Sequence, residues 1–420
     1  MSKLFIKCGK FFDGLEEVLR ENVNIVVEDD IIKEVGENVA CPEGAEVIDL
    51  SDLTVTPGLI DAHLHLDTLH HWQFDSSYMI SDEMKTLNIV HNAEMALQGG
   101  FTTLRYIGSG LRTYGAIDAR NAINDHIFPA SRLVVSPHGM GISGGHSDSS
   151  SSIAGNFYLS EALEKQLNFM GNGVDFYKTY VRKEGKYGAD FIKIMASGGF
   201  ASPNDDPCDC QLDDDELRAI IDTAHRLNKT VTAHVYSAEI AKNLIRMGID
   251  GIEHGSLIDE ETCQMMLDND VYLCCTFQPY QEAVHMDEEK LKTKSPHFQR
   301  KLHKYVDQLR ATRKLVVNKI LEGKMTIGYG TDMVSVYECW ECWREFHTWR
   351  EEGIPALRTL RAATSVNAKI LGMENMIGSI EPGKKADISA WHRDIENDIE
   401  AISECDFVMK DGIVYKPYSK

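Results

Sequence analysis

The amino-acid sequence predicts an α/β protein, a (β/α)8 TIM-like barrel with a small β-sandwich domain built from both termini. Residues 1–56 and 376–420 carry short alternating segments broken by Gly, Asn and Pro, a pattern typical of strands and turns. Residues 57–375 instead alternate apolar runs with amphipathic stretches, which indicates repeated βα units and a parallel sheet. Eight apolar runs in this middle part favour a closed barrel.

The strand-like segments at the two ends of the chain are expected to pair with each other. They would form one domain, 1–56 plus 376–420, beside a barrel domain, 57–375. The segments are LFIKCGKFF (4–12), NIVVEDDII (24–32), AEVIDL (45–50), KADISAW (385–391), DFVMK (406–410) and GIVYK (412–416).

The expected barrel strands are GLIDAHLHL (58–66), FTTLRY (101–106), RLVVSPHG (132–139), DFIKIMASGG (190–199), TVTAHVY (230–236), GIEHGS (251–256), VYLCCTFQP (271–279) and MTIGYGTD (325–332). Amphipathic helices are expected between most of them, among others at 81–100, 212–228, 237–248 and 259–270. The loops 139–157 and 197–211 follow the third and fourth strands. Barrels keep their chemistry in loops of this kind, so the site is expected there.

Composition and charge exclude several classes of function. The 420 residues are 43% hydrophobic, and no apolar run approaches the ~20 residues that cross a bilayer. The net charge of −22 would repel the phosphates of nucleic acid. The amino-terminal segment lacks the apolar run of a signal peptide. We therefore expect a cytoplasmic protein with no membrane or nucleic-acid partner.

The ten cysteines are expected to be reduced thiols, because disulfides are rare in cytoplasmic proteins. Cys339 and Cys342 form a lone CxxC, and Cys208 and Cys210 form a CxC. A zinc ribbon needs two CxxC pairs, so we expect inert thiols instead of a structural zinc site.

The functional prediction begins with His63 and His65 in the first barrel strand. Side chains two residues apart on a strand point the same way, so both imidazoles can face one metal ion. Four further strands each end in one polar residue within an apolar context: Lys193, His234, His254 and Asp332. Strand ends converge on one mouth of a barrel, so the six residues can meet. Four histidines and a carboxylate suit zinc, with iron, manganese or cobalt as alternatives.

Lys193 is the unusual member of this set, because a cation repels its ammonium group and burying that group unpaired is costly. It is either paired with a nearby Asp, extended to the rim, or converted by carbon dioxide to a carbamate anion that bridges two metals. The residues alone leave these alternatives open.

Seven segments together resemble the amidohydrolase superfamily: TPGLIDAHLHLD, ADFIKIMASGG, AHRLNKTVTAHVY, GIDGIEHGS, YGTD, RAATSVNAKILGM and IGSIEPGKKADI. They span nearly the whole chain, in order. Within the superfamily the sequence is most similar to the group of prolidases, Xaa-Arg/Lys carboxypeptidases and imidazolonepropionase-like enzymes. The resemblance implies a (β/α)8 barrel beside a β-sandwich, which is also what the strand pattern predicts.

The resemblance implies a role for each ligand. The buried metal would be held by His63, His65 and Asp332, the more exposed metal by His234 and His254, and both by carboxylated Lys193 together with a hydroxide. Imidazolonepropionate hydrolases resemble mononuclear members and lack this lysine, so Lys193 favours the binuclear, peptidase-like branch. Asp332 would serve as general base and then as general acid.

Three further positions are candidates for substrate contact. His146, in the loop ISGGHSD, and Tyr236, in HVY, resemble residues that contact the scissile carbonyl or the carboxylate. Tyr236 is alternatively a tyrosine at the barrel mouth with a satisfied hydroxyl. Arg105 would anchor a loop or a substrate carboxylate. The family usually has an Asp where this sequence has Tyr106, and this departure puts the pocket wall there in doubt.

Two other polar features are expected to be solvated. They are His70 and His71, after the first barrel strand, and the acidic loop PNDDPCDC (203–210). The loop would alternatively favour a basic leaving residue.

The expected reaction is hydrolysis of the amide bond of a dipeptide or N-acyl amino acid with a free C-terminal carboxylate, as in an Xaa-Pro dipeptidase or a carboxypeptidase. Two divalent ions, most simply zinc, would lower the pKa of a shared water and polarise the carbonyl. Their charges, summed with those of the carbamate, Asp332 and hydroxide, leave the site about one unit positive, which would attract a carboxylate. The expected partners are this small-molecule substrate and further copies of the chain in a homo-oligomer.

Other activities use the same ligands. A cyclic amidohydrolase or deaminase of the imidazolonepropionase-like type is one alternative, and a lactonase or phosphotriesterase is another. A non-catalytic scaffold is disfavoured, because scaffolds lose ligands and this chain keeps all six.

Overall fold

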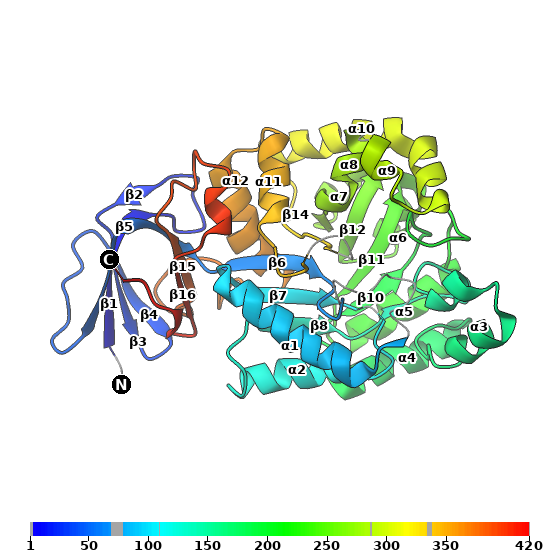
Figure 1. Ribbon diagram of the computed structural model, residues 1–420, viewed down its shortest axis with the longest axis horizontal. Helices are drawn as coiled ribbons and strands as arrows, with labels where there is room; N and C mark the ends of the chain where they lie inside the picture. The colour runs from blue at the N-terminus through cyan, green and yellow to red at the C-terminus, as the bar shows by residue number, and fades with distance from the viewer. Residues whose placement is uncertain (1–2, 69–78, 109, 286–287, 334–337, 420) are drawn as a thin grey trace.

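The computed structural model describes residues 3–68, 79–108, 110–285, 288–333 and 338–419. Figure 1 shows a β-sheet with both chain ends at one side of the molecule and a helix-covered set of parallel strands at the other. The α/β class predicted from the sequence is confirmed.

The two chain ends pair in one mixed sheet of eight strands, ordered β17-β16-β15-β5-β1-β3-β4 with β2 added to β1. The strands are β1 (Lys3–Phe11), β2 (Arg20–Glu21), β3 (Asn24–Glu28), β4 (Ile31–Gly36), β5 (Glu46–Pro57), β15 (Ile388–Trp391), β16 (Phe407–Lys410) and β17 (Ile413–Lys416). The amino-terminal β5 pairs with the carboxy-terminal β15, as the sequence predicts.

This sheet differs from the expected sandwich, because its hydrogen bonds connect all eight strands into one sheet. The Ile32 N–H donates to Lys384 O at 2.9 Å, so the edge strand β4 bends back to the segment that precedes β15. Side chains from both chain ends, among them Ile6 and Ile388, fill the core that this curl encloses. The division of the chain at 56/57 and 375/376 stays a prediction.

The parallel strands form two hydrogen-bonded sheets, β6-β7-β8 and β9-β10-β11-β12-β13-β14. Their bounds are β6 (Leu59–Leu64), β7 (Phe101–Ile107), β8 (Arg132–Ser136), β9 (Gly139–Met140), β10 (Ile192–Met195), β11 (Val231–Ser237), β12 (Gly251–Leu257), β13 (Tyr272–Cys274) and β14 (Ile327–Gly328). Each of the eight predicted segments contains a strand, and the third contains β8 and the first residue of β9. The Asp190 N–H donates to Val135 O at 2.8 Å and joins the two sheets on this side.

The two sheets meet again between β6 and β14. The Ala62 N–H donates to Tyr329 O at 3.0 Å, and the Asp332 N–H donates to His63 O at 2.8 Å. The Asn367 side chain donates to a carbonyl oxygen of each side, at 2.7 Å in both cases. These contacts join the two sheets along both of their edges. That the parallel strands form a (β/α)8 barrel stays a prediction.

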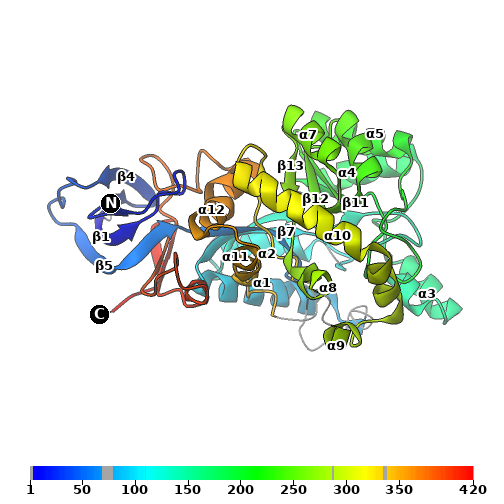
Figure 2. The same cartoon turned by 90° about the horizontal axis from the view of Figure 1, so that it is seen from above.

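The helices cover the outside of the parallel strands (Figure 1), and the long helix α10 lies across them (Figure 2). The main ones are α1 (Asp82–Gln98), α2 (Gly115–Asn124), α4 (Val174–Tyr187), α5 (Asp214–Arg226), α6 (Ala238–Arg246), α7 (Glu260–Asp268), α10 (Pro296–Glu322), α11 (Arg344–Glu351) and α12 (Ala356–Arg361). Shorter ones are α3 (Phe157–Glu164), α8 (Gln281–Val284), α9 (Glu288–Leu291) and α13 (Asn367–Ile370).

The four helices predicted by periodicity are confirmed as α1, α5, α6 and α7. Two of them have acidic caps: Asp213 and Glu216 form a capping box on α5, and the Asp259 side chain accepts the Thr262 N–H at the start of α7. In the part of the chain that the structure describes, no helix combines the length and the apolar character needed to cross a membrane. All ten cysteines are free.

Replacing Asn367 with Ala tests the joint between β6 and β14. The variant loses two donors to buried carbonyl oxygens and the acceptor of the Tyr329 N–H. We expect a loss of about 2–4 kcal/mol in the free energy of unfolding, measured with urea. Asn243→Ala on α6, which removes an exposed hydrogen bond to Asp214, should stay within about 0.5 kcal/mol. Equal effects of the two substitutions would show that Asn367 does not secure the joint.

Candidate metal centre

The six residues predicted to bind metal come from the carboxyl ends of five different strands. They are His63 at the end of β6, His65 just after it, Lys193 in β10, His234 in β11, His254 in β12 and Asp332 after β14. All lie in the interior near one rim, and five are less than 9% exposed. The more accessible one is His65, whose side chain is 14% exposed.

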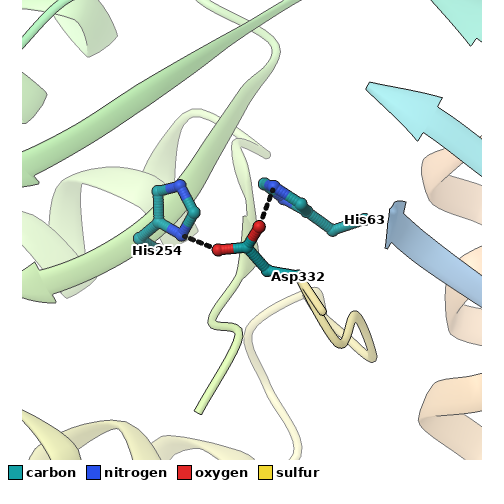
Figure 3. Close-up of side chains that lie close together, drawn as sticks. All are labelled: His63, His254 and Asp332. Carbon is teal, nitrogen blue, oxygen red and sulfur yellow. Dashed lines mark ion pairs between the residues drawn. The ribbon is translucent and has the colours of Figure 1, made fainter. Parts of the chain in front are cut away.

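Asp332 lies among three of the histidines. Its Oδ1 is 3.3 Å from His65 Nε2 and 3.5 Å from His63 Nε2, and its Oδ2 is 3.7 Å from His254 Nδ1. Figure 3 shows His63 and His254 approaching this carboxylate from opposite sides. Potential ligand atoms of His63, His254 and Asp332 lie within 4.8 Å of one another, a spacing that one metal ion can occupy.

His234 and Lys193 complete the group. The His234 ring centroid lies 4.6 Å from that of His254. Lys193 is fully buried, and its Nζ has no hydrogen-bond partner among the described residues. Its charge acts on Asp332 and on three of the histidines, so it belongs to the same site.

The electrostatics of this cluster favour metal-binding forms of the side chains. Burial lowers the pKa of His63, His234 and His254, so these imidazoles are neutral and each offers a lone pair. Burial also lowers the pKa of Lys193 to about 8. Burial opposes ionisation of Asp332, but His63 and His65 outweigh it and hold its pKa below the usual value.

These observations fit a metal ion. The donors are neutral imidazoles around an ionised carboxylate, and two buried nitrogen atoms, Lys193 Nζ and His65 Nδ1, find no hydrogen-bond partner among the residues that the structure describes. The described residues therefore include a histidine and aspartate group able to hold a metal.

The backbone is left-handed at two of the predicted ligands, with φ of 69° at His254 and 48° at Asp332. Thr276 shares this conformation (φ 40°), and its Oγ1 lies 2.8 Å from His254 Nδ1. Side chains of adjacent strand residues normally point to opposite faces. The turn at His254 instead lets both Glu253 and His254 face the interior.

Two carboxylates that support the ligands were missed in the sequence analysis. Glu253 Oε2 lies 2.7 Å from His63 Nδ1. Asp61 accepts the backbone N–H groups of His63 (3.0 Å) and Thr331 (3.2 Å) and the Thr331 hydroxyl (2.7 Å), so it connects the chain at two ligands. The available signal was an acidic residue inside an apolar strand, in GLIDAHLHL and in GIEHGS.

Two of the predicted substrate contacts lie beside the histidines. The His146 ring stacks on that of His234 with centroids 4.2 Å apart, and its Nδ1 lies 2.8 Å from Ser202 Oγ. The Tyr236 ring stacks on that of His254 at 5.3 Å, and its hydroxyl bonds to that of Tyr280. The structure therefore also contains the alternative feature considered for Tyr236, a satisfied hydroxyl.

Arg105 lies elsewhere. It is 2% exposed, and from β7 it donates to Glu253 Oε1 in β12 at 3.0 Å and to the Tyr272 hydroxyl in β13 at 2.6 Å. This placement gives Arg105 an internal role in place of the expected contact with a loop or a substrate carboxylate. The neighbouring Tyr106 is fully buried in the main hydrophobic core.

The acidic loop is fastened to α10. Asp205 Oδ1 is 2.9 Å from Lys301 Nζ, and Asp206 Oδ2 is 2.7 Å from Lys304 Nζ. These contacts do not support the alternative in which the loop selects a basic leaving residue. His70 and His71 lie outside the described residues.

Comparison with known proteins agrees with this geometry. The model of the amidohydrolase family matches residues 54–420. The chain belongs to the amidohydrolase family. It is a hydrolytic enzyme.

Among solved structures, this amidohydrolase is similar to an Xaa-Pro dipeptidase with methionine bound in its active site, at 29% identity and a TM-score of 0.85, with 99% of this chain and 100% of that chain covered. It has the fold of Aspergillus niger ochratoxinase, at 24% identity and a TM-score of 0.84, with 99% and 96% covered. In sequence it is 29% identical to that ochratoxinase over 284 residues, which are 64% of this chain and 58% of the ochratoxinase. The matched region therefore spans little more than half of that relative.

Replacing His63 with Ala tests the centre. We expect the variant to retain less metal after dialysis than the unaltered protein, because the carboxylate of Asp332 loses a neighbouring donor. The measurement is metal per chain by elemental analysis. His225→Ala is the control, because His225 is an exposed histidine on α5 paired with Asp250. Equal metal content in both variants would contradict a site at His63.

Proposed function

We propose that this amidohydrolase is a binuclear, metal-dependent enzyme that cleaves the amide bond of dipeptides or N-acyl amino acids with a free C-terminal carboxylate. The site would lie in a closed (β/α)8 barrel, with zinc as the simplest metal. The observation that carries the proposal is Lys193, a buried amine with no hydrogen-bond partner among neutral histidines and a carboxylate.

The chemistry of Lys193 supports two metal ions. With its pKa lowered to about 8, an appreciable fraction of the amine is neutral near pH 7–8. The nitrogen lone pair can then form a bond to the carbon of carbon dioxide while the amine releases one proton. The product is a carbamate with two oxygen donors and a negative charge, which removes the cost of burying an unpaired ammonium group.

In this proposal His63, His65 and Asp332 would hold one ion, His234 and His254 would hold the other, and carboxylated Lys193 would contribute to both sites. The two ions would supply Lewis acidity for the carbonyl and for a water molecule. Asp332 would accept a proton from the attacking water and return it to the leaving nitrogen. His146 and Tyr236, beside the metal-facing histidines, are the candidates to hold the substrate.

The proposal of a linear substrate with a carboxylate rests on the similarity of this chain to known proteins. The similar Xaa-Pro dipeptidase matches over both full chains, and its name denotes a dipeptide substrate. A ring-opening amidohydrolase is the second class considered, because the chain is 40% identical over 105 residues to a dihydroorotase of Geobacter metallireducens. That likeness covers 24% of this chain, so the dipeptidase is favoured.

Lys193 variants test the two-metal site. We expect Lys193→Ala to hold fewer metal ions per chain and to lose activity by more than the roughly 100-fold that loss of a supporting group costs. Lys193→Arg keeps a positive charge but forms no carbamate, and it should be equally inactive. Elemental analysis and steady-state kinetics measure both effects. Lys410→Ala is the control for the loss of a buried lysine. Lys410 lies in β16, and its ammonium group donates to Ala130 O. Active wild-type protein with one or no metal per chain would exclude the binuclear site.

Blocked substrates test the carboxylate. For Xaa-Pro dipeptides and N-acyl amino acids, we expect conversion of the C-terminal carboxylate to an amide to lower kcat/KM by about 10–100-fold, the value of one hydrogen bond to a charged group. Release of the free amino acid or its amide provides the measurement. If amidated or cyclic substrates are cleaved as well as the free acids, the enzyme belongs to the alternative class.

A further inference from the structure

We propose that Glu253 and Arg105 are positioning residues for His63, which they hold in the tautomer that turns a free Nε2 lone pair toward the metal centre. This inference rests on the proposed metal site and adds a supporting layer to it. Glu253 is fully buried in β12, directly before His254, and its side chain lies among the barrel strands.

The contacts of Glu253 determine where the proton of His63 sits. Glu253 Oε2 lies 2.7 Å from His63 Nδ1, and both side chains are at most 1% exposed. An ionised carboxylate only accepts hydrogen bonds, so a neutral His63 donates through Nδ1–H. Its Nε2 then carries the lone pair, and this atom faces Asp332 Oδ1 at 3.5 Å. The opposite tautomer would place a lone pair 2.7 Å from the Glu253 carboxylate, closer than the 3.5 Å between Nε2 and Asp332 Oδ1, and is therefore the less favourable of the two.

Arg105 keeps Glu253 ionised and in place. Its guanidinium donates to Glu253 Oε1 at 3.0 Å, and the Thr232 hydroxyl donates to the same oxygen at 2.6 Å. The carboxylate therefore faces two donors, one of which is a guanidinium that stays charged. Arg105 is in turn fixed by the Tyr272 hydroxyl at 2.6 Å and by the Phe191 ring, 4.1 Å from its guanidinium carbon.

Glu253 also acts on the charge of Lys193, although no hydrogen bond joins the two side chains in the part of the chain that the structure describes. The pair of Arg105 and Glu253 is neutral overall, so it orients His63 without adding charge to the site. Groups that hydrogen-bond a metal-binding histidine in this way typically contribute 10–100-fold to metal affinity or activity.

Glu253→Gln tests the proposal, because it keeps the shape of the side chain and removes its charge. We expect the metal-loaded variant to release metal to a competing chelator about 10–100-fold faster than the unaltered enzyme, with kcat lowered and KM little changed. Glu253→Asp should recover part of the metal retention, since it restores the carboxylate. Release rates and kinetics equal to those of the unaltered enzyme would overturn the proposal.

A second buried pair of the same chemistry provides the control. His138 Nδ1 lies 3.0 Å from Glu184 Oε1, both are at most 1% exposed, and the His138 ring packs against those of Tyr114 and Phe169. Glu184→Gln should alter the stability of the protein and leave metal release unchanged. Equal acceleration in Glu184→Gln and Glu253→Gln would show a general loosening of the structure, which would also overturn the proposal.

Nitrogen NMR of the metal-free, histidine-labelled protein gives a test that depends on neither metal nor substrate. The His63 resonances, assigned by comparison with His63→Ala, should show a proton on Nδ1 and none on Nε2. A proton on Nε2 would overturn the proposal even if the variants fail to fold. If the protein retains no metal, the proposed function is wrong, but the NMR spectrum still shows which nitrogen of His63 carries the proton. If metal binds but dipeptides are not cleaved, the rate of metal release still tests the role of Glu253.

Discussion

The hydrogen bonds between β6 and the segment around β14 determine the geometry of the centre. His63 and Asp332 are 269 positions apart in the chain, yet the Asp332 N–H donates to the His63 carbonyl at 2.8 Å. This bond brings a carboxylate to His63 and His65, and Asp61 and Asn367 hold the same joint with side chains. Without it, the remaining ligands would form an open arc. Closure and metal binding therefore depend on the same few contacts.

The interior is organised in two polar layers. The ligand layer at the rim contains histidines, Lys193 and Asp332, and the layer next to it contains Glu253, Arg105 and Thr232. The second layer supplies opposite charges that compensate each other, while in the first layer Lys193 is left without a hydrogen-bond partner. The first layer therefore contains residues that can bind a ligand, and the second contains residues that hold those ligand-binding residues in place.

Much of this could be predicted from sequence, because the signals are local. A period of two in His63 and His65 shows which side chains share a face, and polar residues at the ends of apolar strands mark the rim. The role of Arg105 could not be predicted, because its partners Glu253 and Tyr272 lie on strands that only the fold brings near. The single curled sheet was missed for a similar reason: alternation shows that a segment is a strand and not which edge it meets.

The left-handed backbone conformation of two residues at the site can be interpreted without reference to related proteins. A left-handed backbone costs an L-residue with a Cβ atom about 1–2 kcal/mol, and Gly or Asn would be more comfortable there. At His254 and Asp332 the chain nevertheless carries a histidine and an aspartate. Both donor atoms therefore stand on backbone that glycine would hold at lower cost, so the position of each donor is tied to the conformation of the main chain itself.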